Sequence, residues 1–231
     1  MPIYDREKEY LRLLSEREMS VRELAERLYV SEPTVRRDII AMREKELVLS
    51  RRGNVSLNVH APDRRIPSFI RELADAEKKR KIAEKAKLYI KDGMVIMLDA
   101  STTAYCLVPH LVEFHNLFVI TSGARTALAL AELGIRTLCT GGELIPESYS
   151  YIGGDALRTL MAYNADVAFF SCHTLSDDGI AADNSIAEND IRKMIIKKSK
   201  KSYLLCDSSK FSKLSLNTLC DVKDIDGVIS D

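Results

Sequence analysis

The sequence predicts an α/β protein with a small helical head and a larger domain built on an open, mainly parallel sheet. Two patterns carry this prediction. The first 45 residues hold three amphipathic helical stripes, whereas from Met94 onward six apolar runs alternate with helical segments of roughly a dozen residues. At 231 residues the chain is long enough for both parts.

Two helices are expected at the start of the head. The first lies within residues 3–17. The second is expected to begin at Ser20, because Ser20 followed by Glu23 matches a capping box. The residues expected to be buried by these helices are Tyr10, Leu11, Leu14, Leu24, Ala25 and Leu28.

A third helix is expected to start after Ser31, which is a suitable N-cap, with Pro33 tolerated in the first turn. Its apolar stripe points one way and its Thr and Arg side chains point elsewhere, so the helix can lie in a major groove. The stripe consists of Val35, Ile39 and Met42. The candidate DNA-binding residues are Ser31, Thr34, Arg36 and Arg37.

A basic hairpin follows the third helix. The stretch "LVLSRRGNVSLN" alternates apolar and polar residues around Gly53 and Asn54, and Arg51 and Arg52 lie near its tip. These arginines are expected to contact the DNA phosphates. An Arg pair alone is usually only a solvated pair of charges, but the ordered set of helices and basic hairpin predicts a winged helix-turn-helix over residues 1–60.

Residues 61–92 are predicted to form a basic linker. The stretch begins with Pro62 and Pro67 and continues as a helix with Ile82, Ala86 and Ile90 at spacings of four. It holds 10 Lys or Arg against 6 Asp or Glu, whereas residues 93–190 hold 3 against 12. Any contact with DNA must therefore come from the N-terminal part of the chain. The run "EKKRK" is interpreted as a solvated helix face, with a second DNA contact as the alternative.

Residues 93–231 are predicted to form the larger domain, with an open, mainly parallel sheet covered on both faces. Its expected strands span residues 94–99, 117–121, 135–140, 166–171, 202–207 and 226–230. Five of these strands end in small or polar residues. Ligands of such sheets bind at the carboxyl ends of strands, where helix N-termini attract anions such as phosphate. A single hydroxyl cluster after a strand is usually only a helix cap, but five such strand ends together indicate a binding site.

Several segments resemble the DeoR-type bacterial transcription regulators. The segment "SVRELAERLYVSEPTVRRDI" is similar to the helix-turn-helix of that family, whose hallmark is V-S-x-x-T-[IV]-R-R-D. The segments "MLDASTTA", "FVITSG", "TGGEL", "AENDIRKMII" and "LLCDSSKF" are similar to its effector domain in order and spacing. The second similarity extends from about Glu77 to Asp231.

The resemblance implies roles for both parts. It assigns DNA contact to Thr34, Arg36 and Arg37. It also implies that the larger domain is related in fold to ribose-5-phosphate isomerase and binds phosphorylated sugars or sugar derivatives. The effector-site residues that it implies are Asp99, Ser101, Thr102, Thr103, Thr121, Gly141, Gly142, Glu188, Asp207 and Lys210. The strand-end pattern adds Ser122 and Ser171.

Two departures from the family pattern matter. The family's D-[SA]-G-T-T is D-A-S-T-T here, so Ser101 replaces a glycine. The loop loses freedom for positive φ and gains a hydroxyl, and we expect the effector to be held differently or to differ in kind. The wing reads "SRRGNVSL" in place of the family's R-x-x-G-G-A, so the resemblance supports the wing contacts less than the helix contacts.

These features predict a transcriptional regulator, a repressor of carbohydrate-metabolism genes whose operator affinity changes when a sugar phosphate binds. One alternative is a sugar-phosphate isomerase-like enzyme with Glu188 as the base. Another is a regulator that senses a non-sugar phosphorylated metabolite. We expect no catalytic residue, because a regulator needs a recognition helix and a basic linker, whereas an isomerase gains no function from them.

The expected partners are an operator in double-stranded DNA, the effector, and further copies of the chain. A dimer or tetramer is expected because one head reads only a few base pairs. No metal and no cofactor are expected, since the five cysteines form no CxxC pair and no histidine lies at zinc spacing from them. The chain contains no long apolar run and no apolar stretch near its N-terminus, which predicts no membrane partner and a cytoplasmic location.

Overall fold

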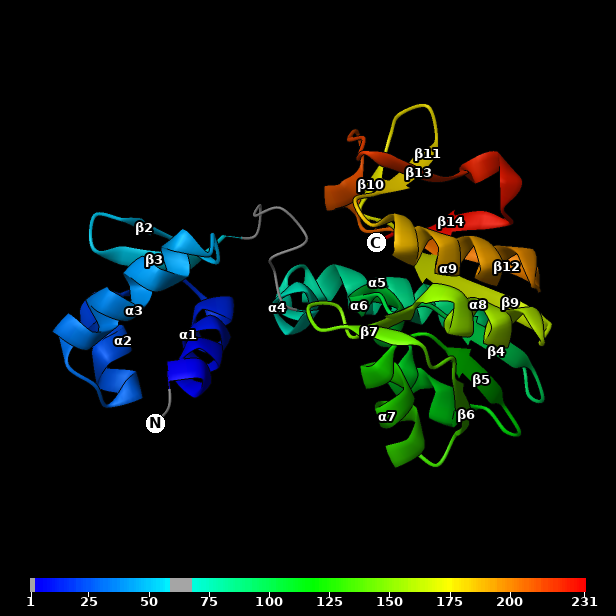
Figure 1. The fold of residues 1–231 in the computed structure, drawn as a ribbon, viewed down its shortest axis with the longest axis horizontal. Coiled ribbons are helices and arrows are strands. Elements are labelled where there is room, and N and C mark those ends of the chain that lie inside the picture. The colour runs from blue at the N-terminus through cyan, green and yellow to red at the C-terminus, as the bar shows by residue number, and fades with distance from the viewer. Residues whose placement is uncertain (1–2, 59–67) are drawn as a thin grey trace. The chain divides into compact units, whose positions relative to one another are not determined.

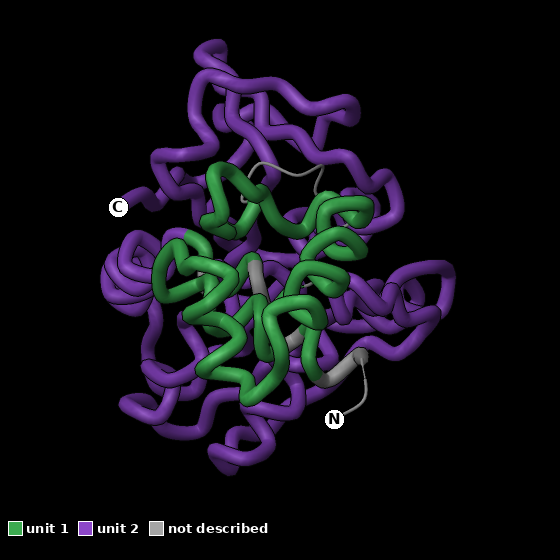
Figure 2. Tube along the Cα trace, turned by 90° about the vertical axis from the view of Figure 1, so that its left-hand side faces the viewer, with its two compact units in different colours: residues 1–74 green, residues 75–231 purple. Residues whose placement is uncertain are grey.

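The structure is a computed structural model that describes residues 3–58 and 68–231. It divides into two compact units, residues 1–74 (unit 1) and residues 75–231 (unit 2), coloured separately in Figure 2. Each unit has a hydrophobic core of its own. The two units are described separately below.

Unit 1 is a winged helix-turn-helix, as the sequence predicts (Figure 1). Its strands form an antiparallel sheet in the order β1-β3-β2. The elements are α1 (Ile3–Glu16), β1 (Met19–Ser20), α2 (Val21–Leu28), α3 (Glu32–Glu44), β2 (Val48–Arg51), β3 (Asn54–Leu57) and α4 (Ser68–Leu73). Ser20 and Ser31 cap α2 and α3, because their side chains accept hydrogen bonds from the N–H groups of Glu23 and Thr34.

The predicted helical stripes form the core of unit 1. All nine predicted residues belong to this core, and Leu28 is the one that is only partly buried. Strand residues complete the core from the other side, chiefly Met19, Val48 and Val55. The three helices and the small sheet therefore bury one shared apolar face, which orients α3.

The wing turn differs by one position from the sequence expectation. The two turn residues are Arg52 and Gly53, with φ of 50° and 84°, and Asn54 already pairs with Arg51 in the ladder. Positive φ at both turn residues is the geometry that joins two twisted strands through a two-residue loop. Arg52 therefore lies in the turn itself, and Arg51 ends β2.

Unit 2 contains a six-stranded parallel sheet in the order β14-β12-β9-β4-β5-β6 (Figure 1). Each of the six predicted strands is one strand of this sheet. Their bounds are β4 (Val95–Leu98), β5 (Phe118–Thr121), β6 (Arg136–Cys139), β9 (Ala165–Ser171), β12 (Ser199–Leu205) and β14 (Gly227–Ile229). The helices are α5 (Ala76–Ala86), η2 (Lys87–Tyr89), α6 (Thr102–Tyr105), η3 (Val108–Glu113), α7 (Ala124–Glu132), α8 (Gly153–Met161), α9 (Ile186–Lys197), η4 (Ser208–Lys210) and η5 (Val222–Asp224).

Both faces of the large sheet are covered, as predicted. Alternate strand residues point to opposite faces, so Ile96 and Leu98 belong to one core and Met97 to another. The first core receives apolar residues from α5, α6, η3 and α7, and the second from α8 and α9. Helix layers on both sides explain why the strands read as nearly continuous apolar runs.

The sequence analysis assigned the helix near residue 80 to a linker, whereas the structure groups it with unit 2. The physical reason is burial, since Ile82, Ala83 and Ala86 are fully buried in the first core. The helix α5 ends at Ala86, and one 3-10 turn then leads to the buried Ile90. Pro62 and Pro67, which the sequence analysis placed at the start of the linker, lie outside the described residues.

Two smaller sheets of unit 2 were not expected from the sequence. One is the hairpin of β7 (Glu143–Ile145) and β8 (Ser150–Ile152). The other is an antiparallel sheet of β10 (Thr174–Leu175), β11 (Ile180–Asp183) and β13 (Asn217–Asp221). Within the part of the chain that the structure describes, no helix is both long and apolar enough to cross a bilayer.

The turn between α2 and α3 predicts a stabilising substitution. Tyr29 ends α2 with φ of 53° and its side chain is 95% exposed. A left-handed backbone costs a non-glycine residue about 1 kcal/mol, and no packing is lost when the side chain is removed. Tyr29→Gly should therefore raise the free energy of local unfolding of α2 and α3 by about 1 kcal/mol. The measurement is native-state hydrogen exchange in the full chain.

Tyr29→Ala is the matched control for this prediction. It removes the same exposed ring but keeps the Cβ atom that causes the strain, so it should give no comparable gain. Equal stabilisation by Ala and Gly would show that the ring, and not the backbone, is unfavourable.

Candidate functional site

The recognition helix α3 presents the predicted side chains to solvent. Its stripe is buried, whereas Arg36 and Arg37 are exposed. The hydroxyls of Ser31 and Thr34 lie 2.9 Å apart, and the Thr34 N–H donates to Ser31 Oγ at 3.4 Å. These two hydroxyls therefore order each other at the N-terminal end of the helix, the end that meets base edges in helix-turn-helix proteins.

The arginines of unit 1 differ in their ion pairs. Arg36 Nη2 lies 3.3 Å from Glu32 Oε2, so its charge is partly compensated. Arg37, Arg51 and Arg52 are exposed and form no ion pair with any residue that the structure describes. Uncompensated positive charge on a helix and its wing is the electrostatic pattern of a surface that binds nucleic acid.

Asp38, which directly follows the two arginines, has a structural role that the sequence analysis did not assign. Its Oδ2 accepts hydrogen bonds from Arg6 Nε at 3.1 Å and from the Tyr10 hydroxyl at 3.2 Å. Burial and the Asp38 carboxylate raise the pKa of Tyr10, so the phenol stays protonated and donates. This carboxylate ties α1 to α3 and fixes the helix that carries Arg37.

In unit 2, the predicted effector residues meet at the point where the strand order reverses. The chain runs from β4 outward through β5 and β6, and then returns to β9 on the other side of β4. Such a switch point opens a crevice at the carboxyl ends of the strands. Asp99 follows β4 and Ser171 ends β9, and the Ser171 N–H donates to Asp99 Oδ2 at 3.2 Å.

The carboxylate of Asp99 is buried and fully engaged. Its Oδ1 accepts from the N–H and the hydroxyl of Ser101, at 3.1 and 2.5 Å. Its Oδ2 accepts from Arg192 Nε at 3.0 Å as well as from Ser171. The residue is 1% exposed. Asp99 therefore organises the loop after β4, and the Ser101 that replaces the family glycine is held against it.

Arg192 and Asp183 complete an ion triad with Asp99. Arg192 Nη1 donates to Asp183 Oδ2 at 2.7 Å, and both side chains are almost fully buried. Burial opposes the charge on Arg192, but the carboxylates of Asp183 and Asp99 raise its pKa. Burial likewise opposes the charge on Asp183, yet Arg192 and two backbone N–H groups hold its pKa below the ordinary value. The sequence analysis missed both residues, because neither stands at a predicted strand end.

Lys210 reaches across β9 from the segment after β12. Its ammonium group donates to Ser171 Oγ at 3.0 Å and to the Cys172 carbonyl at 2.9 Å, and lies 3.6 Å from Asp207 Oδ2. Asp207 is buried, which opposes its charge, but Lys210 and Ser209 keep its pKa below the ordinary value. The structure therefore brings together Asp99, Ser171, Asp207 and Lys210.

A second lysine in this region was not predicted. Lys79 of α5 is 4% exposed. Burial, reinforced by the neighbouring charge of Lys210, lowers the pKa of Lys79 to about 8, against the opposing effect of Asp207. The "EKKRK" run was interpreted as a solvated face, and the structure corrects this for Lys79, whose position on the helix points it into unit 2. The signal was available in the stripe of Ile82 and Ala86, since Lys79 precedes them at helical spacing.

The remaining predicted residues lie at neighbouring strand ends. Thr121 Oγ1 accepts the Gly123 N–H at 3.0 Å, and Gly141 and Gly142 have φ of 66° and 106° after β6. Any side chain at Gly142 would meet the Ile152 carbonyl. The hydroxyl-bearing candidates Thr102, Thr103 and Ser122 lie after β4 and β5.

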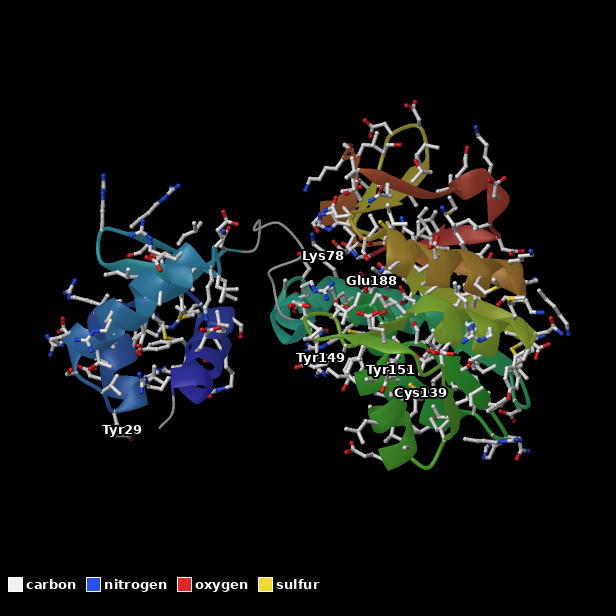
Figure 3. The ribbon with its side chains drawn as sticks, in the orientation of Figure 1. Tyr29, Lys78, Cys139, Tyr149, Tyr151 and Glu188 are labelled. Atoms are coloured by element: carbon white, nitrogen blue, oxygen red, sulfur yellow. The ribbon has the colours of Figure 1, made fainter. Side chains whose placement is uncertain are left out.

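Glu188 lies in the first turn of α9 and is half-buried, and it helps to raise the pKa of Arg192. Figure 3 labels it together with Tyr149 and Tyr151 of the hairpin, and with Cys139 at the end of β6. Among the residues searched, which are those the structure describes, no group of three His, Cys, Asp or Glu side chains could hold a metal ion. The donors brought together here include the Lys210 ammonium and the hydroxyls of Ser101 and Ser171, which suit an anion rich in oxygen.

Comparison with solved structures gives matches over part of this chain. The structure of eIF2B delta from Chaetomium thermophilum matches with a TM-score of 0.52 and 19% identity, and covers 70% of this chain and 58% of that one. Ribose 5-phosphate isomerase a from Methanocaldococcus jannaschii matches with a TM-score of 0.46 and 20% identity, and covers 61% of this chain and 56% of that one. This chain thus spans less than two thirds of either structure.

Relatives match over nearly the whole chain. The uncharacterized HTH-type transcriptional regulator YulB of Bacillus subtilis is 30% identical over 233 residues, covering 100% of this chain and 90% of that protein. The L-fucose operon activator of Escherichia coli is 28% identical over 221 residues, with 95% and 90% covered. The lactose phosphotransferase system repressor of Staphylococcus epidermidis is 28% identical over 232 residues, with 99% and 92% covered.

Family models match both units. Residues 6–60 match the model described as the DeoR-like helix-turn-helix domain, and residues 74–231 match the one described as the DeoR C terminal sensor domain. The second match alone covers more than half of the 231 residues. The resemblance read from the sequence is thereby confirmed: the chain belongs to the DeoR family of helix-turn-helix transcriptional regulators.

Proposed function

We propose that this regulator represses genes of carbohydrate metabolism, and that a phosphorylated sugar or sugar derivative bound in unit 2 changes its affinity for operator DNA. The observation that carries the proposal is the pair of sites on one chain. Arg37 on α3 and Arg51 and Arg52 on the wing carry charge that no described residue compensates, and Lys210 lies with serine hydroxyls at a strand switch point. Relatives named for the lactose phosphotransferase system and the L-fucose operon support the sugar class.

The DNA contact is proposed to divide between bases and phosphates. Arg37 and Thr34, at the N-terminal part of α3, are assigned to base edges, which Arg reads best at guanine. Arg51 and Arg52 of the wing are assigned to phosphates, because they lie at the tip of a hairpin and are not compensated by acidic side chains. Arg36 and Ser31 are assigned to phosphate contacts beside them.

The effector is proposed to lie over the carboxyl ends of β4, β5, β9 and β12. Lys210 and the hydroxyls after β4 are suited to a phosphoryl group, whereas carboxylates accept sugar hydroxyls. Asp207 and Glu188 are the carboxylates assigned to that role. Effector binding can change the affinity for DNA only if the effector binds two arrangements of the chain with different affinities.

We further propose that the site senses its ligand without converting it. Proton abstraction from a sugar carbon needs a carboxylate that is available as a base. Asp99 accepts four hydrogen bonds and is 1% exposed, and Asp207 is occupied by Lys210 and Ser209. Glu188 is the remaining candidate base. Turnover of ribose 5-phosphate that Glu188→Gln abolishes would contradict the sensing proposal.

The regulator is proposed to act as a homo-oligomer, a dimer or a tetramer, in the bacterial cytoplasm. One recognition helix contacts only a few base pairs, so operator affinity requires heads spaced by whole helical turns. The location follows from the DNA partner. A non-sugar phosphorylated metabolite would use the same anion-binding groups and is the second candidate class of effector.

Removal of Arg37 should weaken operator binding. Arg37→Ala should raise the Kd for the DNA upstream of its own operon by about tenfold or more, because one bidentate base contact is worth about 1–3 kcal/mol. The measurement is a gel shift or fluorescence anisotropy titration at several salt concentrations.

Arg158→Ala is the matched control for this measurement. Arg158 is an exposed arginine of α8 in unit 2, so the variant loses the same charge away from the head. Its Kd for the same DNA should stay within twofold of the parent protein. If Arg37→Ala binds as tightly as the control at every salt concentration, α3 is not the reading helix.

Removal of Lys210 should abolish effector binding. Sugar phosphates of three to six carbons, added one at a time, should include one that raises the Tm of the full chain, since a ligand that binds only the folded state stabilises it. Lys210→Ala should lose that shift, because the ammonium group is a principal charge of the crevice.

Lys213→Ala serves as the control here. Lys213 is an exposed lysine three residues further on, whose ammonium donates to the Ser209 carbonyl at 2.8 Å. The control should keep the ligand-induced shift in Tm. A shift retained by Lys210→Ala would place the ligand elsewhere.

A further inference from the structure

The hairpin β7–β8 folds back over the carboxyl end of β5. The Tyr151 N–H donates to the Ser122 carbonyl at 2.7 Å, and the Ala124 N–H donates to the Tyr149 carbonyl at 2.9 Å. Gly123 and Ser150 also form an antiparallel bridge. The hairpin, which the sequence analysis did not expect, is therefore joined by backbone hydrogen bonds to the loop that starts α7.

The turn of this hairpin contains a serine whose hydroxyl is buried and unpaired. Ser148 precedes Tyr149, whose φ is 53° and whose N–H closes the turn on the Ile145 carbonyl at 2.8 Å. Ser148 is 7% exposed, and its hydroxyl is buried with no hydrogen-bond partner among the described residues. Buried hydroxyls are nearly always paired, so an unpaired one in a turn needs an explanation.

Two further hydroxyls are buried without a partner, one in the loop that receives the hairpin and one shortly after the loop that follows β4. Ser122 Oγ and Thr103 Oγ1 are buried without a partner, and with Ser148 Oγ they are the three such side-chain atoms in the described residues of unit 2. Ser122 is the residue whose carbonyl receives the hairpin. The loop after β4, which leads to Thr103, approaches so closely that a Cβ on Gly123 would lie 3.1 Å from Ala100 Cα.

A positive charge lies at the start of α7, three positions after Ser122 in the chain. The half-buried Arg125 directly follows Ala124, and its guanidinium lies 5.1 Å from the centroid of the Tyr105 ring of α6. The cation thus lies between the end of α6 and the start of α7. Three unpaired hydroxyl donors and one cation on these neighbouring segments match a ligand group that carries negative charge and several acceptor oxygens.

We propose that the β7–β8 hairpin forms one wall of the effector site, and that Ser148, with Ser122 and Thr103, donates hydrogen bonds to the phosphoryl group of the effector. Arg125 provides the neighbouring charge. The inference rests on the proposed function, since it presupposes a phosphorylated effector in unit 2. It adds a wall to the site at the carboxyl end of β5 and makes the hairpin turn a determinant of which phosphate is bound.

The proposal predicts opposite effects on the free and the bound protein. In the free chain, Ser148→Ala removes a buried hydroxyl that has no partner, so the Tm should stay the same or rise. In the complex, the variant loses a hydrogen bond to a charged oxygen, and the Kd should rise about tenfold or more. A serine with a purely structural role would not give this combination.

The experiment uses the full chain and isothermal titration calorimetry. The probe is whichever of glyceraldehyde 3-phosphate, ribose 5-phosphate, fructose 6-phosphate and glucose 6-phosphate most raises the Tm of the unmodified protein. Ser148→Ala and Ser122→Ala should each weaken its binding. The control is Ser199→Ala at the opposite end of β12, where Ser199 Oγ donates to the Ile195 carbonyl at 2.8 Å. That variant should lower the Tm and leave the Kd unchanged.

The outcomes separate the two proposals. If the unmodified protein binds a probe and Ser148→Ala binds it with a Kd within twofold, the hairpin wall is wrong and the proposed function stands. If the unmodified protein binds none of the four probes, the sugar-phosphate effector fails, and this inference fails with it. A Ser148→Ala protein that is less stable when free and binds as before would show a structural serine.

Discussion

The buried ion triad of Asp99, Arg192 and Asp183 is the interaction on which the geometry of unit 2 depends. It joins the loop after β4, the helix α9 and the second sheet through hydrogen bonds of 3.0 and 2.7 Å. Loss of one partner from such a group leaves a buried charge uncompensated, which costs about 3–5 kcal/mol. These charges cannot separate without being exposed to water. They therefore hold the three elements in one arrangement.

The candidate site extends from this triad by a chain of contacts. Asp99 accepts from the Ser171 N–H, Ser171 Oγ accepts from Lys210, and Lys210 lies beside Asp207. The chain crosses the carboxyl ends of β4, β9 and β12, where the strand order reverses. A ligand oxygen can take the place of one hydrogen-bond partner in this chain of contacts. It then acts on groups that are connected to one another. That connection gives an effector a physical means of favouring one arrangement of the sheet ends.

Unit 1 uses a carboxylate in a comparable way. Asp38 joins α3 to α1 through Arg6 and Tyr10, so the helix that carries the DNA candidates is fixed from behind. On the exposed side of α3, Arg36 has an acidic partner in Glu32, whereas Arg37 has none among the residues that the structure describes. The buried side of α3 is thus paired internally, whereas Arg37, Arg51 and Arg52 form no ion pair with any described residue, as the proposed contact with DNA requires.

The sequence by itself determined the features that depend on neighbours along the chain. These are the capped helices of the head, the buried stripe of α3, the six strands of the parallel sheet and membership of the DeoR family. The assignments of individual DNA and effector residues stay predictions.

Only the tertiary structure decided which distant groups meet. Asp99 and Arg192 are 93 positions apart, and the hairpin reaches Ser122 only because β6 lies beside β5 at the edge of the sheet. The burial of Lys79 likewise depends on which face of α5 the sheet covers. Local periodicity specifies which face of an element is apolar, but the partner of a buried charge depends on the order of strands. That order is settled by packing across the whole sheet.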